Sequence, residues 1–159
     1  MSDSTALRLA RRDDAQGIAA LSRDRIERGL GWSWTEPRVW HSIRDPEANV
    51  VVAHRAGRML GFGIMKYRDD EAHLLLLAVH EQAIRCGVGS ALVAWLERSA
   101  LIAGIGRVYL EARLTNEAAR AFYARLGYRE IQTLPGYYQG VEACVRLAKD
   151  LWLAPVAPG

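Results

Sequence analysis

The sequence has 159 residues, which fits one domain with a sizeable core. Hydrophobic residues make up 50% of it and charged residues 25%, as is typical of a globular protein rather than a disordered or fibrous one. The net charge is only +3 and the basic residues form no block, so nothing in the composition predicts binding to nucleic acid.

The sequence shows no sign of membrane insertion, export or metal binding. No apolar run is long enough to cross a bilayer, and the first residues lack the pattern of a signal peptide. The two cysteines, Cys86 and Cys144, lack the spacing of metal ligands and are too few for a disulfide framework. We therefore expect no metal, no membrane association and a location in the reducing cytoplasm.

The N-terminal half alternates short helices and strands. Asp13 and Asp14 supply capping groups for a first helix, and Pro37 lies in the first turn of a second one. Gly57 allows a hairpin turn between two strands, because glycine takes positive φ without strain. The predicted elements are a strand at 7–10, helices at 13–28 and 35–44, and strands at 49–54 and 59–67.

The C-terminal half begins with an apolar strand, residues 72–79, of the kind that is covered on both faces. After it we predict a helix at 88–103, a strand at 108–114, a helix at 116–126, and strands at 128–134 and 143–147. The order β-α-α-β-β-β-α-β-α-β-β predicts an α/β (α+β) fold, a mixed sheet of about seven strands with four helices. We expect one domain over residues 1–153 and a disordered tail at 154–159.

A glycine-rich turn joins the apolar strand to the next helix, in the run Arg85-Cys86-Gly87-Val88-Gly89-Ser90. The first amides of a helix have no partners within the helix, and the helix dipole adds partial positive charge there. Glycines without Cβ atoms let a ligand approach this backbone closely. The turn therefore predicts an anion site, of the kind that holds phosphate groups.

The strand at 108–114 carries an ionisable residue where apolar ones are expected. Side chains alternate along a strand, so Tyr109, Glu111 and Arg113 share one face. A charged group in a central strand is costly unless it is paired or solvated. Glu111 is thus either the partner of a nearby arginine or a carboxylate in a wet cleft, where it can accept a proton from an amine.

The helix at 116–126 presents two different faces. Asn116 and Tyr123 are seven residues apart and therefore lie on one face, two turns from each other. Ala118, Phe122 and Leu126 form another, apolar face, which we expect to pack into the core. The core then does not need Tyr123, which is either a surface tyrosine or a functional one.

Together these two regions resemble a known family. The glycine-rich turn and the pattern L-E-x-R-x-x-N-x-x-A-x-x-x-Y-x-x-L-G-Y at residues 110–128 are similar to those of the GNAT family, the acetyl-CoA-dependent N-acetyltransferases. The spacings are most like those of its ribosomal-protein-alanine N-acetyltransferase (RimI) type. The chain departs from the family pattern at Ile84, where glutamine or arginine is usual, and Arg85 is the candidate to supply the missing charge.

The resemblance implies a role for each matching residue. Glu111 would be the general base, Tyr123 would protonate the departing thiolate of coenzyme A (CoA), and the Val79 amide would polarise the thioester carbonyl. The residues implied in binding acetyl-CoA are Leu77, Ala78, Val79, Arg85, Cys86, Gly87, Val88, Gly89, Ser90, Asn116 and Tyr123.

The acceptor side is predicted with less detail. In this family the acceptor cleft is bounded by the segment between the first two helices and by the last hairpin. Aromatic residues in these segments suit a peptide terminus or a flat small molecule. The alternative is that they are ordinary core or hairpin packing. The implied acceptor-binding residues are Trp32, Trp34, Glu111, Tyr137 and Tyr138.

The predicted activity is transfer of an acetyl group from acetyl-CoA to a primary amine in a ternary complex. An α-amino group has a pKa of about 8 and a lysine about 10.4, which slightly favours a peptide N-terminus as the acceptor. A small-molecule acetyltransferase of detoxification type and a non-catalytic acyl-CoA sensor are the alternatives. A homodimer is left open.

Overall fold

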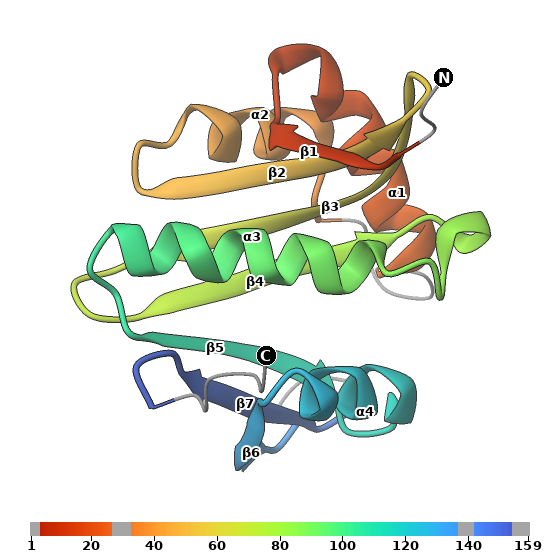
Figure 1. Cartoon of the computed structure of the whole chain (residues 1–159). Coiled ribbons are helices and arrows are strands. Elements are labelled where there is room, and N and C mark those ends of the chain that lie inside the picture. The colour runs from red at the N-terminus through yellow and green to blue at the C-terminus, as the bar shows by residue number, and fades with distance from the viewer. Residues whose placement is uncertain (1–3, 27–32, 137–141, 154–159) are drawn as a thin grey trace.

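The computed structural model describes residues 4–26, 33–136 and 142–153, which form a seven-stranded mixed sheet with helices on both faces (Figure 1). The strand order is β1-β2-β3-β4-β5-β7-β6. The helices and strands are β1 (Ala6–Leu9), α1 (Ala15–Arg25), α2 (Glu36–Arg44), β2 (Ala48–Arg55), β3 (Arg58–Tyr67), β4 (Ala72–Val79), α3 (Val88–Ile102), β5 (Arg107–Arg113), α4 (Glu117–Arg125), β6 (Arg129–Leu134) and β7 (Cys144–Asp150). The predicted fold class and element order are confirmed, while the predicted tail at 154–159 lies outside the described residues.

Two predicted boundaries in the first half were only partly right. A short 3-10 turn, Arg12–Asp14, precedes α1, and Asp14 accepts a hydrogen bond from the Arg11 amide at 2.7 Å and one from Arg8 at 2.7 Å, instead of capping α1 with its side chain. The helix ends at Arg25, before the predicted end at residue 28. The hairpin turn lies where it was predicted, with Ala56 at φ 50° and Gly57 at φ 79°, the positive values that a two-residue β-turn requires.

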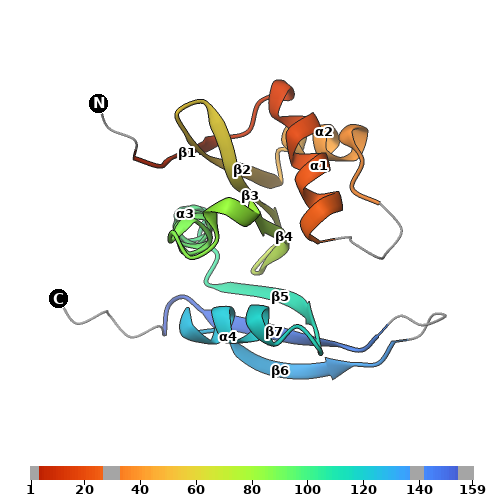
Figure 2. The same cartoon turned by 90° about the vertical axis from the view of Figure 1, so that its right-hand side faces the viewer.

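The sheet separates two hydrophobic cores. Helices α1 and α2 cover one face of β2–β4, and α3 lies across the opposite face (Figure 2). Strand β4 serves both cores, because Leu74 packs with α3 while Leu76 and Ala78 pack with α1 and α2. Across the described ranges, every helix is too short or too polar to span a membrane.

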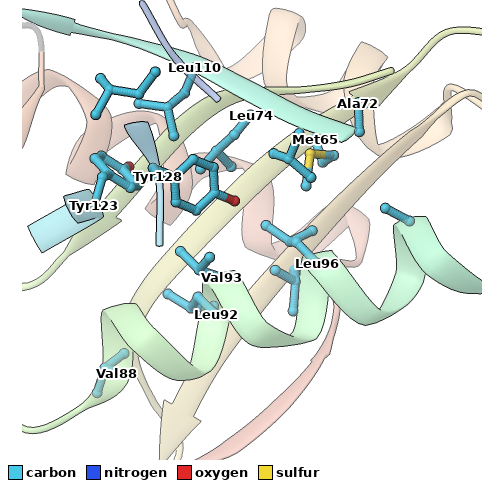
Figure 3. Packing of buried hydrophobic residues seen from close by; sticks show 14 of the residues in the cluster. Met65, Ala72, Leu74, Val88, Leu92, Val93, Leu96, Leu110, Tyr123 and Tyr128 are labelled. Atoms are coloured by element: carbon cyan, nitrogen blue, oxygen red, sulfur yellow. The ribbon is translucent and has the colours of Figure 1, made fainter. Parts of the chain in front are cut away.

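Helix α4 packs differently from our prediction. Tyr123 is its buried residue, only 8% exposed, and its ring lies in the α3-side core with that of Tyr128 (Figure 3). Ala118 is exposed, and Phe122 and Leu126 are only partly buried. The prediction was wrong because it considered only the helix, whereas the edge contact with Tyr128, 5.6 Å between ring centroids, comes from beyond the helix end.

Strands β4 and β5 stay together only at their beginnings. Their parallel pairing consists of Ala72 with Val108 and His73 with Tyr109. Beyond these pairs β5 follows β7, with which it pairs over its whole length. The remaining part of β4, residues 74–79, therefore has one edge bonded to β3, and no strand of the described residues pairs with its other edge.

Candidate functional site

Two cavities lie where β4 and β5 part. The first, which we call the α3 groove, has a volume of about 620 Å³ and is lined by the end of β4, the glycine-rich turn, the start of α3 and helix α4. The second, the β5 cleft, has a volume of about 350 Å³ and is lined by β4, the end of α1, the end of β5 and Glu142. Both cavities are lined by Leu77, Asn116, Ala119 and Tyr123, so they meet at these residues.

Every residue predicted to bind the coenzyme lines the α3 groove, with the exception of Cys86. Arg85 takes φ 69°, a left-handed conformation uncommon for a residue with a Cβ, and Gly87 takes φ 78° at the start of α3. Cys86 instead lines a separate cavity of about 400 Å³, beside the β2–β3 turn. The structure thus places Arg85 and Cys86 on different sides of the same loop.

The start of α3 provides donors to the groove. Val88, Gly89 and Ser90 open the helix, so their amides have no acceptor within it, and all three residues line the groove. A Cβ on Gly89 would lie 3.1 Å from Cζ of Phe122, which shows that this glycine also lets α3 approach α4. A Cβ on Gly87 would meet nothing within 4 Å, so the positive φ is the reason for glycine there.

The free edge of β4 also offers backbone groups. The His80 amide donates to the Leu60 carbonyl of β3 at 2.7 Å. Because successive amides of a strand point to opposite sides, the amide of Val79 points away from β3, toward the side that β5 has left. The same alternation turns the Leu77 amide to that side, and both residues line the α3 groove.

Asn116, the N-cap of α4, and Tyr123, within α4, line both cavities where they meet. The Oδ1 atom of Asn116 accepts the Ala119 amide at 3.0 Å and so caps the helix, which leaves the Nδ2 donor for a ligand. Burial raises the pKa of the Tyr123 phenol, so that this side chain stays protonated at neutral pH.

Glu111 lines the β5 cleft and is also paired, so its position is compatible with both alternatives that the sequence left open. Its Oε1 lies 2.8 Å from His73 Nε2, and its Oε2 accepts from Arg146 Nε at 3.0 Å. Burial raises the pKa of this carboxyl, but the hydrogen bonds and charges of His73 and Arg146 outweigh that effect and hold it below the ordinary value. Glu111 is therefore a carboxylate at neutral pH.

Part of the lining of the β5 cleft is charged. Arg25 from α1 and Arg113 from β5 line it together with Glu142. Arg113 donates to the Ile26 carbonyl at 3.2 Å and lies 3.8 Å from Glu142, whose carboxylate also accepts from Thr115 at 2.5 Å. These bonds tie the end of β5 to the end of α1 and to the segment before β7.

Of the four predicted aromatic acceptor residues, Trp34 is the one that lies within the described residues. Trp34 is 8% exposed and packs in the core of α1 and α2, with the Arg38 guanidinium 3.9 Å from its ring centroid, and it lines neither cavity. Trp32, Tyr137 and Tyr138 lie outside the described residues. In the described parts of the chain, no three His, Cys, Asp or Glu side chains form a group that could hold a metal ion.

Sequence reasoning missed His73 and Arg146. The only local signal for His73 was a polar ring at the start of an apolar strand. Arg146 is 35 residues from Glu111, and only the antiparallel register of β5 and β7 puts the two opposite each other.

Residues 17–128 match the acetyltransferase (GNAT) family. The chain belongs to this family. A ribosomal protein bS18-alanine N-acetyltransferase of Escherichia coli is 37% identical over a match that covers 70% of this chain and 75% of the relative. An uncharacterized N-acetyltransferase of Methanocaldococcus jannaschii is 35% identical over 62% of this chain, but the match spans only 64% of that relative's length.

The fold agrees with the assignment. The crystal structure of the ribosomal-protein-S18-alanine N-acetyltransferase from E. coli superposes with a TM-score of 0.82 at 23% identity, covering 98% of this GNAT chain and 99% of the other. Family membership makes the chain an acyltransferase with acetyl-CoA as its co-substrate, as the resemblance implied. This finding does not favour the alternative of a non-catalytic acyl-CoA sensor.

Proposed function

We propose that the chain transfers an acetyl group from acetyl-CoA to the α-amino group of a peptide or protein N-terminus, by direct attack in a ternary complex. The observation that carries this proposal is the meeting of two cavities of different character. The α3 groove ends in helix-start amides, and the β5 cleft contains an ionised carboxylate. Tyr123 lines both cavities where they join, which is where the acetyl group would be transferred to the acceptor.

The α3 groove suits acetyl-CoA. The amides of Val88, Gly89 and Ser90 would donate hydrogen bonds to the diphosphate, as helix N-termini do in other anion sites. Arg85 would add the positive charge that Ile84 does not supply. The free edge of β4 offers its backbone to the pantetheine arm, which can pair with it like a strand.

The acyl transfer needs three groups of the chain. Glu111 accepts one proton from the acceptor's ammonium group, directly or through water, and frees the lone pair that attacks the carbonyl carbon. The Val79 amide donates a hydrogen bond to the oxygen that becomes negative; one such donor typically contributes about 3 kcal/mol. Tyr123 donates a proton to the departing sulfur and regains one from the attacking nitrogen, which loses its second proton as the amide forms. Its raised pKa keeps the phenol protonated at neutral pH before the transfer.

A peptide α-amine is the acceptor that the electrostatics favour. The Glu111 pKa lies below its ordinary value, so this carboxylate is a weak base. An α-amine with a pKa of about 8 gives up its proton far more readily than a lysine at about 10.4. The name of the E. coli relative, an alanine N-acetyltransferase of a ribosomal protein, points to the same class of acceptor. The homodimer and the cytoplasmic location stay predictions.

The decisive experiment uses acetyl-CoA with three acceptors of matched concentration. One is a peptide with a free N-terminal alanine and acetylated lysines, the second is the same peptide with a blocked N-terminus and free lysines, and the third is a polyamine. We expect release of the CoA thiol and an acetyl group on the first residue of the first peptide only.

Transfer confined to the polyamine or to lysine would replace the α-amine proposal by a small-molecule or lysine acetyltransferase. Absence both of thiol release and of acetyl-CoA binding by calorimetry would remove the proposed use of the α3 groove altogether.

A further inference from the structure

The β5 cleft contains a cation that is not balanced within the described residues. Four charged side chains line this cleft: Arg25, Glu111, Arg113 and Glu142. Glu111 is balanced by Arg146 at 3.0 Å, and Arg113 lies 3.8 Å from Glu142. Arg25, in the last turn of α1, is exposed and forms no hydrogen bond or ion pair with the other described residues. Its positive charge is therefore available to an acceptor.

The register of β5 shows how far this charge lies from the proposed base. Glu111 and Arg113 share one face of the strand and are two residues apart, about 7 Å along it. Arg113 donates to the Ile26 carbonyl at 3.2 Å, so the end of α1, with Arg25, lies beside Arg113. An extended peptide advances by about 3.5 Å per residue. A peptide with its α-amine at Glu111 therefore brings its second or third residue level with Arg25.

The carboxylate of Glu142 is the group in this part of the cleft that could repel an acidic acceptor. Its charge is already engaged, because Thr115 donates to it at 2.5 Å and Arg113 lies 3.8 Å away. An acidic acceptor side chain would thus meet the unpaired guanidinium of Arg25 beside that of Arg113. A basic side chain in the same place would meet two cations, so the local charge favours an acidic residue.

We propose that Arg25 is a specificity-determining residue, which selects acceptors with aspartate or glutamate at the second or third position. The acidic side chain forms an ion pair with Arg25 while the α-amine of the first residue lies at Glu111. This contact is remote from the reacting atoms and is the same before and during transfer, so it lowers KM and leaves kcat unchanged. The inference rests on the proposed transfer to a peptide α-amine and narrows it to acidic N-termini.

The test compares peptides that differ in one residue. Each begins with alanine and carries glutamate, glutamine or arginine at position two, and a second series carries them at position three. Thiol release is measured with acetyl-CoA at saturation. In at least one series, kcat/KM for glutamate should exceed that for glutamine by about threefold and that for arginine by about tenfold, because an ion pair at an exposed residue is weak. Both ratios should shrink in about 0.5 M salt.

The variant Arg25→Glu should reverse this order, so that the arginine peptide becomes better than the glutamate peptide, through KM and with kcat unchanged. The matched control is Arg23→Glu, which makes the same change of charge in the same last turn of α1 but does not line the cleft. It should keep the wild-type order. The varied residue also shifts the pKa of the peptide's own amine, but it does so equally for every enzyme variant. The comparison between variants therefore isolates Arg25.

A wild-type enzyme that uses the three peptides of both series equally well would overturn the proposal, whether or not the variants fold. So would an Arg25→Glu enzyme that keeps the wild-type order, or an Arg23→Glu enzyme that loses it to the same extent. Failure of the proposed function looks different, because wild-type protein would then release no thiol with any peptide α-amine, whatever residue follows it.

Discussion

Replacing Tyr123 by phenylalanine removes one hydroxyl from the point where the α3 groove and the β5 cleft meet. The ring keeps its edge contacts with Phe122 and Tyr128, at 5.0 and 5.6 Å between centroids, because neither contact uses the oxygen. In the described part of the chain the hydroxyl has no hydrogen-bond partner, so its removal should not lower the free energy of unfolding. Any loss of activity then reports chemistry and not misfolding.

The expected loss is large. A general acid typically contributes a factor of 10² to 10⁴, so kcat of Tyr123→Phe should fall at least about 100-fold, equivalent to about 2.7 kcal/mol of transition-state stabilisation. Affinity for acetyl-CoA should stay within about threefold of the wild type, since the phenol acts on the sulfur only as it departs. The assay combines thiol release with calorimetric titration of acetyl-CoA.

The neighbouring tyrosine is the control. Tyr128 is also buried, but its hydroxyl donates to Glu97 at 2.9 Å and lines neither cavity. Tyr128→Phe should cost about 2 kcal/mol of stability and leave kcat at the assay temperature unchanged. A kcat for Tyr123→Phe within threefold of the wild type, or an equal loss in Tyr128→Phe, would refute Tyr123 as the acid.

Three further changes test the scaffold. Gly89→Ala should weaken acetyl-CoA binding about fivefold, because the new Cβ would lie 3.1 Å from a ring carbon of α4. Lys149→Met should lower the melting temperature by roughly 6–12 °C, because it removes the cation 3.1 Å from the largely buried Glu97 and leaves that carboxylate the Tyr128 hydroxyl, a loss of about 3 kcal/mol. Asp14→Asn should make the free energy of unfolding depend less on pH in the acid range. The Arg8 hydrogen bond lowers the Asp14 pKa in the folded state, so its stabilisation is present above the ordinary value of about 3.9 and is lost as pH falls through the lowered one.

Each of these three predictions has a control variant or an outcome that would contradict it. The Gly89→Ala effect should disappear in a Phe122→Leu background, and persistence there would mean that the helix start and not the packing is disturbed. A shift of less than about 2 °C in Lys149→Met would show that the ion pair contributes little. Asp13→Asn should unfold in acid like the wild type, and equal behaviour of the two aspartate variants would contradict the role given to Arg8.

The sequence predicted those parts of the fold that neighbouring residues determine. The apolar run of β4, the helical repeat of Val88, Leu92 and Leu96, and the positive φ of Gly57 are all local properties, and the structure confirms each. The predicted end of β7 was too early. The strand extends to Asp150 because Lys149 pairs with Val108 of β5 and binds Glu97 of α3, contacts that no pattern within the strand reveals.

The candidate site was predictable to the extent that it follows the glycine-rich turn and the start of α4. The residues predicted to bind the coenzyme, other than Cys86, line one cavity because a strand, a turn and a helix follow each other without interruption. Cys86 was misplaced because the left-handed conformation of Arg85 reverses the loop, and a non-glycine residue gives no sequence signal for that. Trp34 was misplaced because a tryptophan in an acceptor segment and one in a core look alike in sequence.

The groups that tune Glu111 could not be found by any motif. Arg146 reaches it because β7 inserts between β5 and β6, and His73 reaches it because β4 and β5 pair for two residues before they part. These positions lie outside the glycine-rich turn and outside the pattern at residues 110–128. Two GNAT chains can therefore share every motif residue and still differ in the groups that contact the proposed base. The neighbours of the proposed base, and not the motif, hold its pKa below the ordinary value.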